Sequence, residues 1–129
     1  MILIVEDDAQ LLKLMRVFFE EGGLTALCAT TAEEGIELAQ QHRPEIVICD
    51  LYLPGISGLM LAAALKADQA LRGPFLIAIT GAVQGEGMPE EAVRAGFDLF
   101  IEKPFSVSEM IRTVQRIEHK VGLLEEVGW

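Results

Sequence analysis

Acidic residues follow directly on a short apolar segment at the start of the chain. The segment ILIV runs into Glu6, Asp7 and Asp8, and a further acid, Asp50, ends another apolar run. Two carboxylates held about 4 Å apart repel each other by about 4 kcal/mol at an effective dielectric constant of about 20. Gathered carboxylates therefore either take up protons or share a cation. Oxygen ligands in an incomplete shell suit Mg²⁺, which keeps several waters and bridges to phosphoryl oxygens.

The same acids have a second explanation, because carboxylates at the start of a helix are stabilised by the helix dipole. Asp8 fits this explanation and is expected to cap the helix that follows it. Glu6, Asp7 and Asp50 do not fit it, because capping does not account for acids gathered at the ends of separate strands. We therefore interpret these three as a candidate metal site and Asp8 as a helix cap.

Five apolar segments of strand length alternate with segments of helical periodicity. Capping residues mark the helices: Asp8, Thr30 in a Thr-x-x-Glu capping box, Ser57, and Ser106 in a Ser-x-x-Glu box. Pro89 is expected in the first turn of a short helix. The predicted strands are 1–5, 25–29, 46–50, 74–80 and 98–102, and the predicted helices are 9–21, 31–43, 58–65, 89–96 and 107–121.

Strands that are apolar on both faces and separated by helices form a parallel sheet covered on both sides. In such a sheet the ligand site lies at the carboxyl edge of the strands. Glu6 and Asp7 follow the first predicted strand, and Asp50 ends the third. Thr80 ends the fourth and Lys103 follows the fifth. Residues far apart in the sequence are therefore expected to meet at one edge.

The composition is that of one folded domain. The chain has 129 residues, of which 51% are hydrophobic, so a substantial core is expected. The formal net charge of −10 argues against direct binding of nucleic acid and favours metal ions or a basic partner. The apolar start is too short for a signal peptide or a membrane span, so we expect a cytoplasmic protein without membrane contact.

Four residues with reactive or metal-binding side chains are expected to play no part in the chemistry. Cys28 and Cys49 lie inside apolar runs and are interpreted as buried, reduced cysteines. His42 and His119 lie near the ends of predicted helices without clustered ligands, and are interpreted as solvated helix residues.

Four motifs stand in a specific order: the acid pair Glu6-Asp7 after ILIV, Asp50 in VICDLYLPGISG, Thr80 in AITGA, and Lys103-Pro104 in FIEKPF. This order resembles the receiver domain of two-component response regulators, a phosphoacceptor domain similar to the chemotaxis regulators. The resemblance implies a flavodoxin-like, doubly wound α/β fold. Its five-stranded parallel sheet would have the strand order 2-1-3-4-5, with five helices on two faces. The receiver domain is expected over 1–121, and 122–129 as a C-terminal tail where a linker can begin.

The resemblance implies that Asp50 is the phosphoacceptor, which takes a phosphoryl group from a sensor histidine kinase or a histidine phosphotransfer protein. It also implies an Mg²⁺ site, with Mn²⁺ as a substitute. Asp7, Asp50 and the backbone carbonyl of Tyr52 would bind the metal directly, and Glu6 would bind it through water. Phosphoryl transfer depends mainly on positioning and charge neutralisation, so this chemistry agrees with the clustered acids.

Three further roles are implied by the resemblance, and each has a plainer alternative. Lys103 would pair with phosphoryl oxygens, or is a surface charge. Thr80 would hydrogen-bond to the phosphorylated form, or simply forms a hydrogen bond to a turn. Phe100 would be the switch aromatic, or is an ordinary core residue. The peptide bond before Pro104 is expected to be cis, which proline makes accessible.

The implied function is a phosphorylation-dependent signalling switch, with at most self-phosphorylation and self-dephosphorylation activity rather than that of an enzyme. A degenerate receiver that only mediates contacts is one alternative, and the intact set of Asp7, Asp50, Thr80 and Lys103 argues against it. An aspartate-nucleophile phosphatase is another, but Tyr52 stands where such enzymes place a general acid. A nucleotide or flavin binder requires a glycine-rich turn after the first strand, which EDDAQLL lacks.

The resemblance also implies a partner surface on the fourth helix, fifth strand and fifth helix, which would contact an output domain, a partner or a second copy. Arg112, Arg116 and Lys120 recur every four residues on the last predicted helix. Two interpretations stay open for them: a solvated face, or a docking stripe for an acidic partner or a second copy.

The first predicted helix has a wide apolar face. Two pairs on it, Leu11 with Leu14 or Leu12 with Phe19, are expected to exceed what the sheet can cover. The excess would form a patch for docking a kinase.

Overall fold

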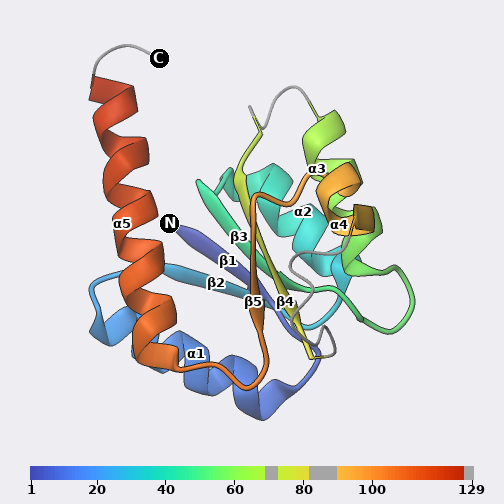
Figure 1. Ribbon diagram of the computed structural model, residues 1–129, viewed down its shortest axis with the longest axis horizontal. Helices are drawn as coiled ribbons and strands as arrows, with labels where there is room; N and C mark the ends of the chain where they lie inside the picture. Colours follow the sequence, from blue (N-terminus) through green and yellow to red (C-terminus); the bar gives the residue numbers. More distant parts are fainter. Residues whose placement is uncertain (69–72, 82–89, 127–129) are drawn as a thin grey trace.

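A parallel sheet forms the centre of the protein. The computed structural model describes residues 1–68, 73–81 and 90–126. The strands in these residues are β1 (Ile2–Val5), β2 (Ala26–Ala29), β3 (Ile46–Asp50), β4 (Phe75–Thr80) and β5 (Leu99–Glu102). They pair in parallel in the order β2-β1-β3-β4-β5 (Figure 1). The flavodoxin-like strand order is therefore confirmed.

Helices cover both faces of the sheet, also as predicted. They are α1 (Ala9–Glu21), α2 (Ala32–His42), α3 (Gly58–Ala67), α4 (Glu90–Ala95) and α5 (Val107–Glu126). Helices α1 and α5 lie on one face, and α2, α3 and α4 lie on the other (Figure 1). Helix α5 continues to Glu126, beyond the predicted domain boundary at 121, and Pro89 lies outside the described residues.

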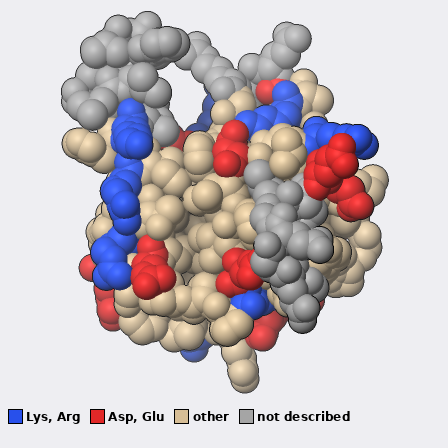
Figure 2. Space-filling model, viewed as in Figure 1, with Lys and Arg blue, Asp and Glu red and all other residues tan. Residues whose placement is uncertain are grey.

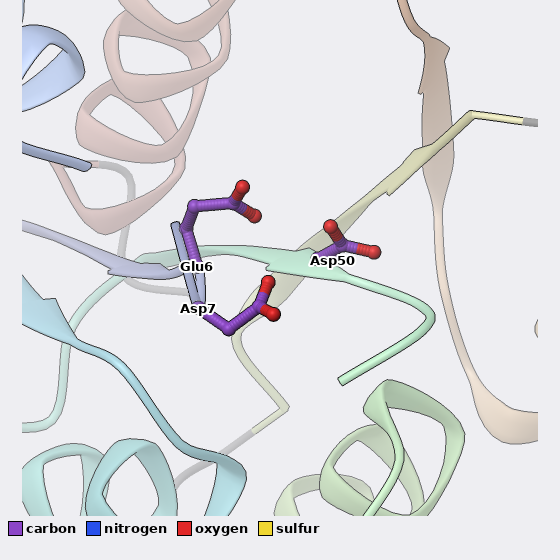
Figure 3. A group of neighbouring side chains, drawn as sticks. All are labelled: Glu6, Asp7 and Asp50. Atoms are coloured by element: carbon purple, nitrogen blue, oxygen red, sulfur yellow. The ribbon is translucent and has the colours of Figure 1, made fainter. Parts of the chain in front are cut away.

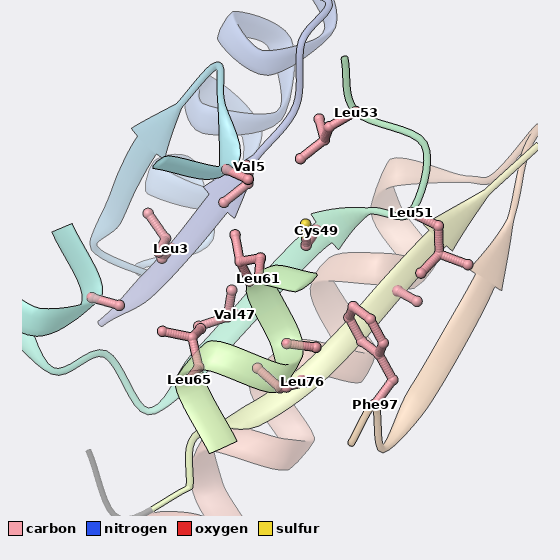
Figure 4. Packing of buried hydrophobic residues seen from close by; sticks show 14 of the residues in the cluster. Leu3, Val5, Val47, Cys49, Leu51, Leu53, Leu61, Leu65, Leu76 and Phe97 are labelled. Carbon is pink, nitrogen blue, oxygen red and sulfur yellow. The ribbon is translucent and has the colours of Figure 1, made fainter. Parts of the chain in front are cut away.

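The central strands are buried on both faces because successive side chains of a strand point to opposite sides. In β1, Leu3 and Val5 point toward α2 and α3 and belong to the same core cluster as Leu61 of α3 (Figure 4). Ile2 and Ile4 pack toward α1 and α5. All of these side chains are fully buried. Each such aliphatic side chain contributes about 1.5–3 kcal/mol of burial, which anchors the strand ends that carry the acids.

Three of the predicted helix caps are confirmed. The carboxylate of Asp8 accepts hydrogen bonds from the first-turn N–H groups of α1 at 3.0 and 3.2 Å. The hydroxyl of Ser57 accepts one at the start of α3, and that of Ser106 accepts one at the start of α5, both at 3.3 Å. Asp8 therefore has a structural role, separate from the other acids beside it.

The cap predicted for α2 is wrong by one residue. Thr31, not Thr30, is the N-cap and accepts the N–H of Glu34 at 3.2 Å. Both threonines begin a Thr-x-x-Glu pattern, so the pattern alone does not separate them. The helix that starts after Thr31 buries Ala32 and Ala39.

The apolar surplus of α1 is real, but of the four named residues only Leu14 contributes to it, because Leu11 packs partly buried against the core. Leu12 and Phe19 are buried, which contradicts the second pair. Leu14 is 46% exposed, and Phe18 is 39% exposed beside the exposed Val17. A helix on a sheet buries only one stripe, so the outer apolar residues remain uncovered.

The cysteines and histidines lie largely as predicted. Both cysteines are free; Cys49 is fully buried, whereas Cys28 is only partly buried. His42 and His119 are exposed. Among the described residues, none of these four side chains belongs to the acid cluster of Glu6, Asp7 and Asp50.

Candidate metal centre

The carboxyl ends of β1 and β3 bring three acids together. Glu6 and Asp7 follow β1, and Asp50 is the last residue of β3, so the pairing of these two strands sets them side by side (Figure 3). One carboxylate oxygen from each residue lies within 4.8 Å of the others. Asp8, the fourth acid of this region, is outside the group. The predicted cluster is therefore present in the fold.

The three acids differ in exposure, although two of them are adjacent in the chain. Glu6 is 1% exposed and Asp50 is 6% exposed, whereas Asp7 is open to solvent. One oxygen of Glu6, Oε2, is buried and has no hydrogen-bond partner in the described part of the chain. Two buried carboxylates and an exposed third form a half-open shell of hard oxygen ligands, which is the donor set that Mg²⁺ or Mn²⁺ prefers.

The surroundings of Glu6 raise the pKa of its carboxyl group. Burial is the largest cause that raises its pKa, from 4.5 to about 7, and the adjacent Asp50 adds to the increase. The positive charge of Lys103 acts in the opposite direction but does not cancel the effect. Without a metal the site therefore holds a proton on Glu6 over part of the physiological pH range, and a divalent cation would displace it.

Lys103 supplies the positive charge at this edge. Its Nζ donates a hydrogen bond to Asp50 Oδ2 at 3.0 Å and lies 3.5 Å from Glu6 Oε1. Partial burial lowers the pKa of Lys103, but the bond to Asp50 and the charges of both acids outweigh this and raise it. The lysine therefore stays charged next to Asp50. The peptide bond from Lys103 to Pro104 is cis.

Backbone contacts fix the orientation of Asp50. The N–H of Tyr52 donates to Asp50 Oδ1 at 2.9 Å, which leaves Oδ2 to Lys103. The Tyr52 side chain is 64% exposed beside the site. The Tyr52 carbonyl remains a predicted ligand, because no contact of the structure tests it.

Thr80 and Phe100 lie on the strands next to β3. Thr80 is fully buried at the end of β4, and its Oγ1 has no hydrogen-bond partner among the described residues. Its carbonyl accepts the N–H of Lys103 at 2.8 Å, which ties the ends of β4 and β5 together. Phe100 on β5 is half-buried and packs against the core shared with α2, α3 and α4. A buried hydroxyl without a partner is uncommon in folded proteins.

Gly58 is a residue of the site that the sequence did not single out. A Cβ at this position would overlap the backbone carbonyl oxygen of Asp50 and lie 2.9 Å from Leu51 Cα. The N–H of Gly58 also donates to the Leu51 carbonyl at 3.1 Å. The start of α3 thus holds the phosphoacceptor candidate in place by close backbone approach, which only glycine allows. The only signal in the sequence was a second glycine in LPGISG.

Among the described residues, no helix combines the length and the apolar character that crossing a bilayer requires.

Comparisons with known proteins agree with this architecture. The model of the response regulator receiver domain matches residues 2–115. The chain is 36% identical over 116 residues to the polar-differentiation response regulator DivK of Brucella anthropi, which covers 88% of this chain and 92% of that protein.

Two solved structures show the same fold. The chemotaxis response regulator CheY4 of Vibrio cholerae has a TM-score of 0.82 at 21% identity, covering 90% of this chain and 96% of that one. A CheY-like response regulator receiver domain protein from Methanospirillum hungatei has a TM-score of 0.77 at 28% identity, covering 98% and 97%. From its strand order, its family match and its similarity to DivK, the chain belongs to the response regulator receiver domain family.

Proposed function

We propose that this protein is a phosphorylation-dependent switch of a two-component system, with Asp50 as the phosphoacceptor. The observation that carries the proposal is the environment of Asp50. Its carboxylate shares a cluster with Glu6 and Asp7, and Lys103 donates to it at 3.0 Å. The site thus combines a nucleophile, a cation and ligands for a second cation within one pocket.

In the proposed reaction, an oxygen of Asp50 attacks the phosphorus of a phosphohistidine on a sensor kinase or phosphotransfer protein. A P–O bond forms, the P–N bond breaks, and the histidine leaves as neutral imidazole after taking up a proton. Bound Mg²⁺ would neutralise charge on the phosphoryl oxygens. Lys103 would pair with one of these oxygens in place of Asp50 Oδ2, and the hydrogen bond from Tyr52 N–H would keep the carboxylate oriented.

Thr80 and Phe100 would convert the new charge into a change of shape. Phosphorylation adds acceptor oxygens to the site, and Thr80 has a buried hydroxyl without a partner. A hydrogen bond from Thr80 to the phosphoryl group would draw the end of β4 inward. Phe100, half-buried on the paired strand β5, would then repack. Two packings with different affinity for a partner are sufficient for a switch.

The partner surfaces follow from the same fold. The exposed face of α4, β5 and α5 would contact an output domain, a partner or a second copy, since Phe100 lies in β5 and Lys103 follows it directly. The uncovered apolar residues of α1, Leu14 and Phe18, would contribute to docking of the kinase. We propose a cytoplasmic location.

The test is formation of an adduct on Asp50. The protein is incubated with Mg²⁺ and acetyl phosphate as a small phosphoryl donor, and its intact mass is measured. We expect one acid-labile adduct that is lost in Asp50→Asn and in the presence of EDTA. Asp8→Asn is the matched control, because asparagine still caps α1 and Asp8 is outside the cluster.

Two outcomes contradict the proposal. An unchanged mass with several donors favours a receiver that only mediates contacts. Continuous turnover of phosphoester substrates that is abolished in Asp50→Asn favours an aspartate-nucleophile phosphatase.

A further inference from the structure

Gly35 lies inside α2, where glycine is one of the least favourable residues for a helix. It is buried, and so are Ala32 and Ala39 of the same helix. Residues three and four positions apart lie on one face of a helix, so these three small residues face the core together. The face of α2 at Gly35 can therefore approach the sheet closely, which accounts for a glycine at this position.

The atoms that face Gly35 belong to the end of β1 and to α3. A Cβ at this position would lie 2.8 Å from Val5 Cγ2 and 3.1 Å from Leu61 Cδ1. Carbon atoms in contact lie about 3.5–4.0 Å apart, so the added atom would displace Val5 or α2 by about 0.7 Å. Leu61 can yield by rotating the end of its side chain, whereas the branched side chain of Val5 has a restricted χ1 angle.

Val5 lies directly before the acid pair and has little room to move. It is fully buried and pairs in register with Ala29 of β2 on one side and with Cys49 of β3 on the other (Figure 4). The next residue, Glu6, donates its backbone N–H to the Ala29 carbonyl at 3.0 Å. A displacement of Val5 would therefore shift the backbone that carries Glu6 and Asp7.

The third acid of the cluster is held by a similar contact. A Cβ at Gly58 would overlap the backbone carbonyl oxygen of Asp50. Each strand that ends in a buried acid, β1 or β3, is thus approached at its carboxyl end by a glycine of a neighbouring helix. Mg²⁺ requires near-ideal octahedral geometry with ligands at about 2.0–2.1 Å, so the spacing of the two strand ends affects how well it is bound.

We propose that Gly35 is a positioning residue of the metal centre. The close contact of α2 with Val5 fixes the end of β1, and with it the placement of Glu6 and Asp7 relative to Asp50. Gly35 acts through Val5 and does not coordinate the metal. This inference rests on the proposed function and deepens it, because it names a packing contact on which the affinity for Mg²⁺ depends.

The test compares Mg²⁺ binding by four full-length proteins in calorimetric titrations: the wild type, Gly35→Ala, Val5→Ala and the double variant. Substitutions that disturb the surroundings of metal ligands cost about tenfold or more in metal affinity, so we expect about a tenfold loss in Gly35→Ala. Val5→Ala removes the two methyl groups that the new Cβ would meet, and the gap should also weaken binding. In the double variant the added methyl group enters this gap, so most of the lost affinity should return.

Calcium separates positioning of the ligands from a general loss of structure. Ca²⁺ accepts ligands at about 2.3–2.6 Å in a flexible geometry. Gly35→Ala should therefore lower the affinity for Ca²⁺ less than the affinity for Mg²⁺. Gly22→Ala is the matched control, because its Cβ would lie 3.1 Å from Ile111 Cγ2, in a tight contact between α1 and α5. Its Mg²⁺ affinity should equal that of the wild type.

Long-range charge is a second influence on cation binding, because the chain has a net charge of −10. Figure 2 shows basic and acidic side chains interspersed on one face of the surface. None of the substitutions adds or removes a charge, so this contribution is the same in all of the proteins. Differences in Mg²⁺ affinity between them therefore report the geometry of the cluster.

Four results would overturn the inference. They are a wild-type Mg²⁺ affinity in Gly35→Ala, an equal loss in Gly22→Ala, equal losses for Mg²⁺ and Ca²⁺, and a double variant that binds Mg²⁺ no better than Val5→Ala. If Gly35→Ala does not fold, the comparison of Val5→Ala with the double variant still decides, because the double variant regains part of the lost volume.

Adduct formation on Asp50 is measured on the same preparations. A normal adduct in the wild type without rescue in the double variant concerns Gly35 alone. Rescue of Mg²⁺ binding without any adduct concerns the proposed phosphoacceptor function alone.

Discussion

Replacing Glu6 with Gln changes the charge of the site with almost no change in shape, and its effect can be worked out from the structure. Glu6 is 1% exposed, and its pKa in the folded protein is about 7 instead of 4.5. Between these values the folded state holds a proton that the unfolded state has released. Stability therefore falls as the pH rises through this window, and the full loss is present above a pH of about 7. At about 1.36 kcal/mol per pH unit, the loss amounts to about 3 kcal/mol.

Glu6→Gln resembles the protonated form at every pH. Without metal, the free energy of unfolding of the variant is expected to exceed that of the wild type by up to about 3 kcal/mol near pH 8. Near pH 4 both proteins are neutral at this position, and the difference is expected to vanish. Urea unfolding followed by circular dichroism, in EDTA, measures both values. Glu37→Gln, an exposed substitution on α2, is the control for a general charge effect.

Magnesium is expected to narrow the difference between the two proteins. A ligand at about one hundred times its Kd stabilises the folded state by about 2.7 kcal/mol. The wild type should gain this amount near pH 8, and Glu6→Gln should gain less because the cluster has lost a charge. The reasoning is refuted if the variant is no more stable than the wild type in EDTA near pH 8, or if its advantage is the same near pH 4.

Three further substitutions test single contacts. Lys103→Met removes the cation 3.0 Å from Asp50 Oδ2. It should therefore tighten Mg²⁺ binding in calorimetric titrations while abolishing productive phosphorylation; weaker Mg²⁺ binding would contradict this. Gly58→Ala should cost about 3 kcal/mol or more in urea unfolding, because the added Cβ overlaps the Asp50 carbonyl oxygen. Gly81→Ala is the control, because its Cβ would meet nothing closer than 3.9 Å, and it should cost less than about 1 kcal/mol in the same measurement. Equal costs for the two substitutions would refute the explanation. Thr80→Val removes a buried hydroxyl without a partner and should stabilise the unphosphorylated protein by about 1 kcal/mol. A clear loss of stability in Thr80→Val would show that the hydroxyl already has an acceptor.

Most of the fold could be predicted because its determinants are local. Apolar segments of strand length, caps such as Asp8 and Ser57, and helical periodicity each need only a few neighbouring residues. The prediction of the α2 cap was wrong because Thr30 and Thr31 begin equivalent capping patterns, between which the local sequence does not choose. The prediction of which α1 residues stay uncovered was wrong in part, because packing against the sheet decides whether Leu12 or Leu14 is buried.

The sequence by itself determined which residues end the strands, and therefore that Glu6, Asp7, Asp50, Thr80 and Lys103 share one edge of a parallel sheet. This follows because all strands of a parallel sheet run in the same direction, so their carboxyl ends lie at the same edge. Tertiary structure alone decided that Glu6 is buried while the adjacent Asp7 is exposed.

It also decided that the Thr80 hydroxyl lacks a partner and that Gly58 lies against the backbone of Asp50. Burial and close approach depend on what other segments place around an atom. The spacing of residues along one segment therefore does not predict them.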